Sequence, residues 1–213
     1  MSHTVVDAEA PTPSEGPDRW KHNPAWATPD ATAFAEILGA LRRVQSAAAF
    51  SAPPAALTSE LIGPLEEIAD HLAAHRTGED GRLAGGSAVG GPGHPLFVPY
   101  EVTSCGARTL RASVEFEPVH VGGNGAVHGG VLPLLFDDVL GVFVAFQSER
   151  HCRTAYLHVN YRKVTPIRRP LRIDAAIDRV EGRKTYVTGR LYDGETLLAD
   201  VEALFVQLLP GQP

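Results

Sequence analysis

Hydrophobic residues recur at helical spacing in the first part of the chain. This spacing predicts a helix over residues 30–49, with an apolar face formed by Phe34, Ile37, Leu38, Leu41 and Val44. It predicts a second helix over residues 58–75, with Thr58 as a weak N-cap and an apolar face formed by Leu61, Leu65, Ile68 and Leu72. Together the two segments form a predicted helical extension over residues 30–77.

The hydrophobic period changes from helix to strand after Leu96. Alternation of apolar and polar residues predicts a half-buried strand with an apolar face formed by Leu110, Ala112, Val114 and Phe116. An apolar helix is predicted over residues 130–147, and strands follow at about 153–162, 170–180, 184–192 and 196–209, with glycine turns between the later ones. One apolar helix before a run of hairpin-linked strands favours an α+β fold, with an antiparallel sheet wrapped around the helix.

Proline and glycine mark the predicted domain boundaries. Residues 1–29 contain five prolines among small polar residues, and we interpret them as a disordered or loosely packed tail. Half of residues 78–95 are Gly or Pro, which predicts a linker. The main domain is therefore expected over residues 96–213.

The net charge of −6 is spread unevenly along the chain. Residues 1–95 carry 12 acidic and 6 basic side chains, whereas residues 96–213 carry 13 of each, which argues against a nucleic-acid-binding module. No apolar run reaches the roughly 18 residues of a membrane span, and no signal peptide is expected. With only Cys105 and Cys152 in the chain, we expect a cytoplasmic location.

The candidate chemistry centres on residues 125–146, where His128-Gly129-Gly130 precedes the apolar helix. Glycines let backbone N–H groups approach a ligand, and a helix N-terminus adds unpaired donors. Asp137 lies among apolar residues of the same helix, where an ionised carboxylate is costly to bury without partners. His128 and Asp137 are roughly 10–13 Å apart along a helix. Both can act on one substrate only if a second copy supplies one of them, as in a symmetric dimer.

The His-Gly-Gly motif, with an aspartate nine positions after the histidine, resembles the PaaI-like hotdog-fold acyl-CoA thioesterases of the 4-hydroxybenzoyl-CoA thioesterase superfamily. The likeness extends to residues 154–163, 180–186 and 203–206, and it covers roughly residues 96–209. It implies a hotdog fold, here with an α-helical N-terminal extension to which the resemblance does not extend. Gly122 stands where many relatives place an asparagine, and glycine there is closer to the mammalian mitochondrial thioesterase superfamily members.

The resemblance also implies the catalytic residues. Asp137 matches the family's catalytic aspartate, as general base or nucleophile; Asp138 is a rival, and the offset from His128 favours Asp137. Gly129 would donate its backbone N–H to the thioester carbonyl oxygen, a donor worth about 3–4 kcal/mol in such sites. His128 would shape the loop or assist the carbonyl. Thr154 would orient the attacking water, or would be a strand-forming residue only.

Two segments are implied to bind coenzyme A. They are the pair Arg162 and Lys163 and the turn formed by Glu181, Gly182, Arg183, Lys184, Thr185 and Tyr186. Basic groups there would hold phosphates through charge-assisted hydrogen bonds. The alternative is a solvated strand edge whose charges prevent aggregation. Weaker candidates are Arg168, Arg169 and Arg172. The histidines are scattered and predict no metal site.

These observations together predict an acyl-CoA thioesterase that needs no cofactor. The expected assembly is a homodimer or homotetramer with active sites at the dimer interface, and neither nucleic acid nor a membrane span is expected. Two alternatives remain open. One is a non-catalytic acyl-CoA-binding or regulatory hotdog protein, and the other is a hotdog enoyl-CoA hydratase, which would pair a histidine with a carboxylate.

Overall fold

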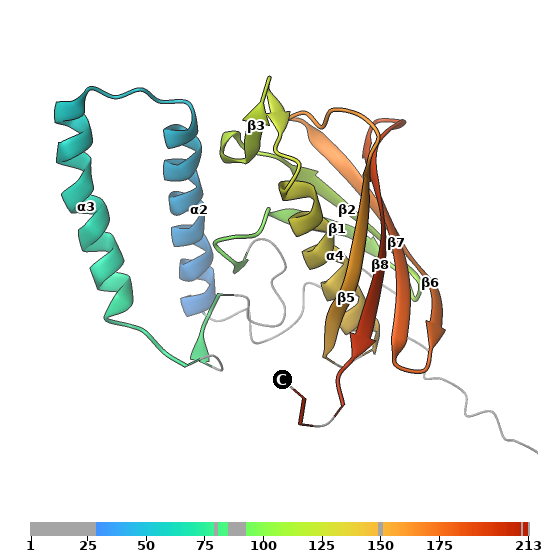
Figure 1. The fold of residues 1–213 in the computed structure, drawn as a ribbon. Coiled ribbons are helices and arrows are strands. Elements are labelled where there is room, and N and C mark those ends of the chain that lie inside the picture. The colour runs from blue at the N-terminus through green and yellow to red at the C-terminus, as the bar shows by residue number, and fades with distance from the viewer. Residues whose placement is uncertain (1–28, 79–80, 85–92, 149–150, 210, 213) are drawn as a thin grey trace, which may run out of the picture.

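The structure is a computed structural model of the 213-residue chain that describes residues 29–78, 81–84, 93–148, 151–209 and 211–212. The predicted tail falls outside the described residues except for its last position, and so does much of the predicted linker. The described part consists of two helices and a sheet domain built around a third, central helix (Figure 1).

Two helices precede the sheet domain, as predicted. Helix α2 spans Pro29–Ala49 and helix α3 spans Ala55–Ala73. Thr58 is not the N-cap of α3, so that prediction is wrong: its backbone N–H and its hydroxyl both donate to the Pro54 carbonyl oxygen, at 3.0 and 3.2 Å. The helix begins earlier because the residues between Pro54 and Thr58 are good helix formers.

Six antiparallel strands form one sheet in the order β1-β2-β6-β7-β8-β5. Their bounds are β1 Tyr100–Cys105, β2 Thr109–Glu115, β5 Cys152–Tyr161, β6 Pro170–Glu181, β7 Lys184–Asp193 and β8 Thr196–Gln207. The four strands predicted after the apolar helix are confirmed to within two residues at each end. Among the described strands β5 pairs only with β8, so one edge of β5 is unpaired.

Helix α4, Val131–Ser148, lies against the inner face of this sheet and forms the core with it (Figure 1). Its buried residues are Leu132, Leu135, Phe136, Val139, Leu140, Phe143 and Val144. By length and composition, α4 also meets the criteria for a membrane-spanning helix. This differs from the sequence analysis, in which no uninterrupted apolar run was long enough to span a membrane. Buried core helices meet the same criteria. The hotdog arrangement expected from the sequence is therefore the arrangement observed.

The sheet packs tightly against α4 at Gly189 of β7. A Cβ at this position would lie 2.8 Å from Val201 Cγ1 and 3.4 Å from side-chain atoms of Phe136 and Leu140. Real side chains do not tolerate a 2.8 Å contact, so any larger residue would push the helix or β8 away. Glycine here sets the separation between the helix and the sheet.

A bulge in β5 changes which of its side chains face α4. The register against β8 shifts between Thr154 and Tyr156, which leaves Ala155 as an extra residue. In a regular strand, residues seven positions apart point to opposite faces. Because of the bulge, Thr154 and Tyr161 both pair with β8 residues whose side chains are buried, so both face the side of the sheet that carries α4.

A short 3-10 helix and a small hairpin connect β2 to α4. They are η4, Pro118–His120, and the strands β3, Val121–Gly123, and β4, Ala126–Val127. Helix α2 packs against η4, with Leu38 buried, and Arg42 donates to the His94 carbonyl oxygen at 2.8 Å.

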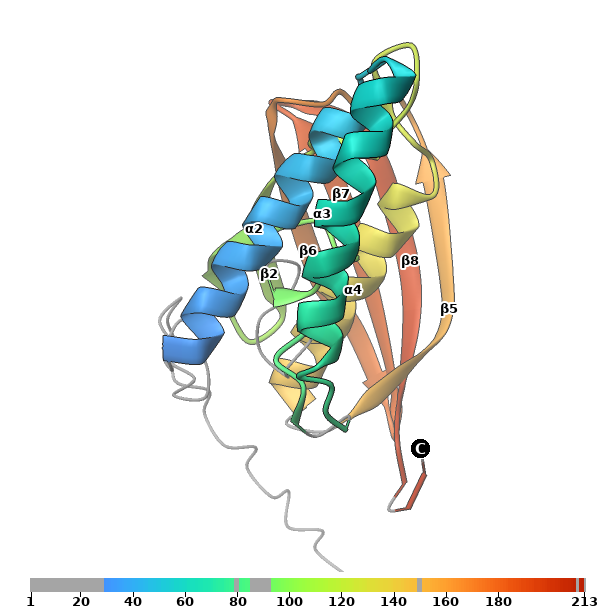
Figure 2. The same cartoon turned by 90° about the vertical axis from the view of Figure 1, so that its left-hand side faces the viewer.

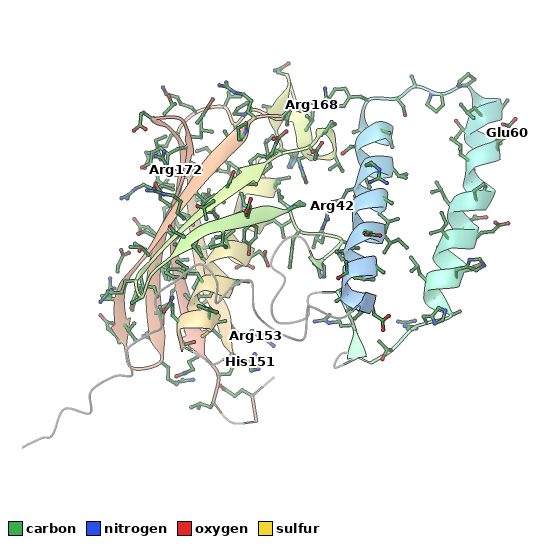
Figure 3. All side chains as sticks on the ribbon, turned by 180° about the vertical axis from the view of Figure 1, so that it is seen from behind. Arg42, Glu60, His151, Arg153, Arg168 and Arg172 are labelled. Carbon is green, nitrogen blue, oxygen red and sulfur yellow. The ribbon has the colours of Figure 1, made fainter. Side chains whose placement is uncertain are left out.

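Helix α3 stands apart from this packing and has no buried residue. Both extension helices lie on the α4 side of the domain (Figure 2). Arg42 points from α2 toward the domain, whereas Glu60 lies on the side of α3 that faces away from it (Figure 3).

The core around α4 predicts a clear contrast in stability. Phe143 is fully buried, whereas Leu61 of α3 is 49% exposed. Phe143→Ala should lower the free energy of unfolding by about 3–5 kcal/mol, because it leaves a cavity under the sheet. Leu61→Ala, a matched large-to-small change, should cost less than about 1 kcal/mol. Urea unfolding of both variants measures the difference, and equal losses would contradict the packing described.

Candidate active site

His128, Gly129 and Gly130 form the turn between β4 and α4, at the N-terminal end of the helix. The His128 N–H donates to the His120 carbonyl oxygen at 2.7 Å, and the Val131 N–H donates to the His128 carbonyl oxygen at 2.9 Å. The Gly130 N–H donates to Nδ1 of His128 at 3.0 Å. Since Nδ1 accepts this bond, the neutral imidazole carries its proton on Nε2.

The Gly129 N–H is the unused donor of this turn. None of the described residues accepts a hydrogen bond from it, and Gly129 is exposed. The start of a helix also presents the positive end of its dipole. This N–H is therefore free to bind an oxygen that gains negative charge, whereas the Gly130 N–H is already held by the His128 ring. Of the two roles considered for His128, the geometry favours shaping the turn.

Gly122 of β3 lies directly against this turn. A Cβ at position 122 would lie 2.8 Å from Cα and 3.1 Å from Cβ of His128. An asparagine there would displace the backbone of His128, so the glycine and the present position of the histidine depend on each other.

Asp137 and Thr154 are brought together by the packing of α4 beside β5. The Thr154 hydroxyl donates to Oδ1 of Asp137 at 2.7 Å. A hydroxyl has one proton to donate, so Thr154 holds the carboxylate and can only accept from a water. Asp137 is exposed in the single chain, and the burial expected from the sequence is not provided by its own chain. Its second carboxylate oxygen is available to solvent or substrate.

The chain thus carries two half-sites at different places. Gly129 lies beside Tyr161 at one end of β5, and Asp137 lies beside Thr154 near the other end. The α-carbons of Thr154 and Tyr161 are about 20 Å apart along the strand, counting six regular steps and the bulge. One thioester group cannot contact both half-sites of a single chain.

Tyr161 is a site residue that the sequence interpretation missed. Its hydroxyl donates to the Gly129 carbonyl oxygen at 2.7 Å, and a Cβ at position 129 would lie 3.7 Å from Cε1 of its ring. An aromatic residue at the end of a strand was the only signal. Without knowledge of the bulge, strand periodicity places Tyr161 on the face opposite Thr154.

Most of the candidate arginines form ion pairs on the sheet. Arg162 pairs with Asp200, which also accepts from the Asn160 amide at 2.8 Å, and the ion pair lowers the pKa of the Asp200 carboxyl. Two weaker candidates are likewise paired, in the pairs Arg169–Asp193 at 3.0 Å and Arg172–Asp174 at 3.1 Å. By contrast, the Lys163 ammonium has no ion-pair partner among the described residues.

The predicted turn of residues 181–186 is the hairpin between β6 and β7. Gly182 has φ of +58°, a conformation that favours glycine in a two-residue turn. Arg183 donates to the Gln207 carbonyl oxygen at 3.0 Å, and Lys184 has no ion-pair partner among the described residues. The other two long side chains of the hairpin are held by Arg179, which pairs with Glu181 at 2.8 Å and lies 3.5 Å from the ring centroid of Tyr186.

Strand register places this hairpin at the level of the carboxylate half-site. Thr154 of β5 pairs with Phe205 of β8, which pairs in turn with Thr185 of β7. Two strand spacings separate Thr154 from Thr185, about 10 Å. Thr185 itself is buried and faces the core, so its hydroxyl is not presented to solvent as a ligand contact. The described residues contain no group of three His, Cys, Asp or Glu side chains placed to hold a metal ion.

Similarity to known proteins decides the family. A crystal structure of a thioesterase superfamily protein shares 30% sequence identity with this chain, with a TM-score of 0.70. The match covers 81% of this chain and 94% of that chain. The chain belongs to the thioesterase superfamily. Since residues 96–213 make up little more than half of the sequence, the similarity includes part of the N-terminal helical extension.

Two further comparisons agree with this assignment. The family model described as "Thioesterase superfamily" matches residues 124–199, which contain the turn, Asp137, Thr154 and the hairpin. Acyl-coenzyme A thioesterase THEM4 of Mus musculus is 33% identical over 91 residues, or 42% of this chain, and the rat protein is 34% identical over the same length. The chain spans only 39% of the length of these relatives.

The fold alone is shared with a more distant structure. The protein smu.793 of Streptococcus mutans, solved bound to acetyl CoA, has a TM-score of 0.50 and 17% identity. That similarity covers 53% of this chain and 91% of that protein.

The turn of this thioesterase superfamily chain depends on His120, whose carbonyl oxygen anchors His128. Burial lowers the pKa of His120, and the nearby Arg42 guanidinium lowers it further. His120 Nδ1 also accepts from the Glu117 N–H at 2.9 Å, a bond that protonation of Nδ1 would break.

A pH dependence of stability follows from the lowered pKa of His120. Because its folded pKa lies below the unfolded value of about 6.5, its contribution is complete above that pH and is lost as pH falls below it. We expect the free energy of unfolding to fall between pH 7.5 and pH 5.5, and to fall less in His120→Gln. His94, whose pKa is lowered by burial and by nearby arginines, supplies a remaining decrease of the same sign. Urea unfolding across this range measures both slopes, and identical slopes would contradict the assignment.

Proposed function

We propose that this chain hydrolyses acyl-CoA thioesters, with Asp137 activating water and the Gly129 N–H binding the carbonyl oxygen. The observation that carries the proposal is the pair of half-sites: a carboxylate that accepts a hydrogen bond from Thr154, and an exposed N–H at a helix N-terminus that has no acceptor among the described residues. Together they supply the base and the oxyanion donor that ester-type hydrolysis needs.

The two half-sites meet if two copies pair through the free edges of β5. A two-fold axis between Leu157 and His158 would place Thr154 of one copy opposite Tyr161 of the other, because antiparallel pairing reverses the order of residues. The carboxylate of one chain would then face the Gly129 N–H of its partner. Pairing would also cover the unpaired strand edge and remove Asp137 from bulk water.

The reaction balances with these groups alone. Oδ2 of Asp137 takes a proton from water as the water oxygen attacks the thioester carbonyl carbon. The carbonyl oxygen becomes negative and receives the hydrogen bond of the partner's Gly129. The carbon–sulfur bond then breaks, and the departing thiolate recovers the proton from Asp137. Direct attack by Asp137, through an acyl-enzyme anhydride, is the variant that uses the same contacts.

Lys163 and Lys184 are the best candidates for the coenzyme A phosphates. Both are exposed and lack ion-pair partners among the described residues, whereas Arg162 is paired with Asp200. Arg183 keeps donors beyond the one that binds the Gln207 carbonyl oxygen. Charged groups that are not already paired bind a phosphate without first breaking an ion pair.

The hydrogen bonding of the His128 ring favours thioester hydrolysis over hydration of an enoyl-CoA. A hydratase would pair the histidine with a carboxylate for proton transfer at carbon. Here Nδ1 of His128 accepts the Gly130 N–H, and no carboxylate among the described residues bonds to the ring. A purely binding protein remains distinguishable by assay, because it would take up acyl-CoA without releasing thiol.

Removal of the carboxylate should abolish turnover. Asp137→Asn keeps the side-chain size but cannot take a proton, so kcat should fall by about 10²–10⁴-fold, the usual worth of a general base. Thiol release from acyl-CoA, followed with a thiol-reactive dye, measures this loss. Asp138→Asn is the matched control on the same helix turn and should retain activity. Full activity in the Asp137 variant would defeat the assignment of Asp137.

Mixed dimers test whether each site uses two chains. Asp137→Ala lacks the base, and Gly129→Pro lacks the backbone donor. Each variant alone should be inactive, with its fold checked by circular dichroism. When the two variants are mixed in equal amounts and exchange subunits, half of the dimers contain one chain of each kind. Each of these dimers carries one intact site out of two, so about a quarter of wild-type activity should return. No recovery from two folded, exchanging variants would contradict a shared site.

A further inference from the structure

We propose that Tyr161 is a positioning residue that fixes the direction of the Gly129 N–H. The inference rests on the proposed thioesterase function, because it assigns how the oxyanion donor of that site is held in place. It concerns a side chain that lies outside the expected catalytic and binding residues.

The peptide group between Gly129 and Gly130 is held at both ends, and the hydrogen bond from Tyr161 holds one of them. The Gly129 carbonyl and the Gly130 N–H belong to the same planar unit. The Tyr161 hydroxyl donates to the carbonyl oxygen at 2.7 Å, and Nδ1 of His128 accepts the N–H at 3.0 Å. A peptide plane held at both ends cannot rotate about its flanking bonds without breaking one of these contacts.

The neighbouring peptide group is then held with only its donor free. The His128 carbonyl and the Gly129 N–H form this unit, and the carbonyl oxygen accepts from the Val131 N–H at 2.9 Å. Carbonyl and N–H of a trans peptide point in opposite directions, so the free N–H is aimed away from the helix. Three bonds thus fix two peptide planes and leave one N–H for a ligand.

Such restraint is needed because the turn contains two adjacent glycines. Glycine has the largest backbone freedom of any residue, and a mobile N–H would lose much of the advantage of a preorganised donor. Side-chain bonds to the turn replace the stiffness that a Cβ would otherwise give. His128 restrains the turn from within, and Tyr161 restrains it from the neighbouring strand.

The contact serves the turn more than the core. Tyr161 is 55% exposed, so the interior does not depend on its ring. The extra residue Ala155 places Tyr161 on the same face of the sheet as Thr154. The bulge therefore aligns both residues of β5 that hold the site: Thr154 holds the carboxylate, and Tyr161 holds the donor.

Removal of the Tyr161 hydroxyl tests the role. Tyr161→Phe keeps the ring and should keep the fold, but it frees the Gly129 carbonyl. We expect kcat for acyl-CoA hydrolysis to fall about tenfold, less than the 10²–10³-fold loss of a whole donor, while KM stays within about twofold. Tyr192→Phe on β7, which also loses one phenol hydroxyl and whose ring contacts Arg172 rather than Gly129, is the matched control and should leave kcat unchanged.

A second measurement does not require activity. Water–amide exchange of the Gly130 N–H, followed by NMR on labelled protein, should become about tenfold faster in Tyr161→Phe and remain unchanged in Tyr192→Phe. If the wild-type chain does not hydrolyse thioesters, the proposed function fails, and the exchange rate alone decides whether Tyr161 restrains the turn.

The outcomes separate cleanly. A lower kcat together with faster Gly130 exchange supports the positioning role. Unchanged exchange overturns it, and a lower kcat in that case shows that the hydroxyl acts on the substrate directly. Faster exchange with unchanged kcat in an active enzyme also overturns it, because the restraint would then not matter for the donor.

Discussion

Burial of α4 is the constraint on which the rest of the structure depends. An 18-residue helix that is apolar over most of its surface has to be enclosed, and the six-stranded sheet encloses it from one side. Gly189 allows the sheet to approach closely enough for that packing. Once the helix is fixed, its N-terminus carries the glycine turn and its second turn carries Asp137, so core packing sets the position of both. Groups placed by a rigid core lose little entropy when they act on a substrate.

The same packing leaves an open strand edge and an exposed carboxylate, and pairing of two chains would cover both. In the part of the chain that the structure describes, no strand pairs with the outer edge of β5, and Asp137 is exposed beside it. An open strand edge invites pairing with another chain. In the proposed dimer, pairing of the two β5 edges would satisfy the open backbone groups and also bring each carboxylate to the donor of the other chain. The same pairing would then complete both the candidate site and the sheet.

The helical extension is connected to the site through backbone contacts. Helix α2 packs on η4, whose last residue, His120, accepts the hydrogen bond of the His128 N–H. The extension therefore supports the turn through η4, whereas Tyr161 supports it from β5. The similarity of this chain to a solved thioesterase superfamily protein also includes part of the extension.

The sequence by itself determined the elements and the chemistry of their residues. Periodicity located the helices and the later strands, and the spacing from His128 to Asp137 predicted that one chain would not complete the site. Only the tertiary structure decided which side chains hold those residues. The bulge at Ala155 reverses the facing of β5, which no local pattern records, and so Thr154 meets Asp137 while Tyr161 meets Gly129. Ion pairing of Arg162 and burial of Thr185 were likewise decided by neighbouring strands, because contacts across a sheet depend on register rather than on sequence separation.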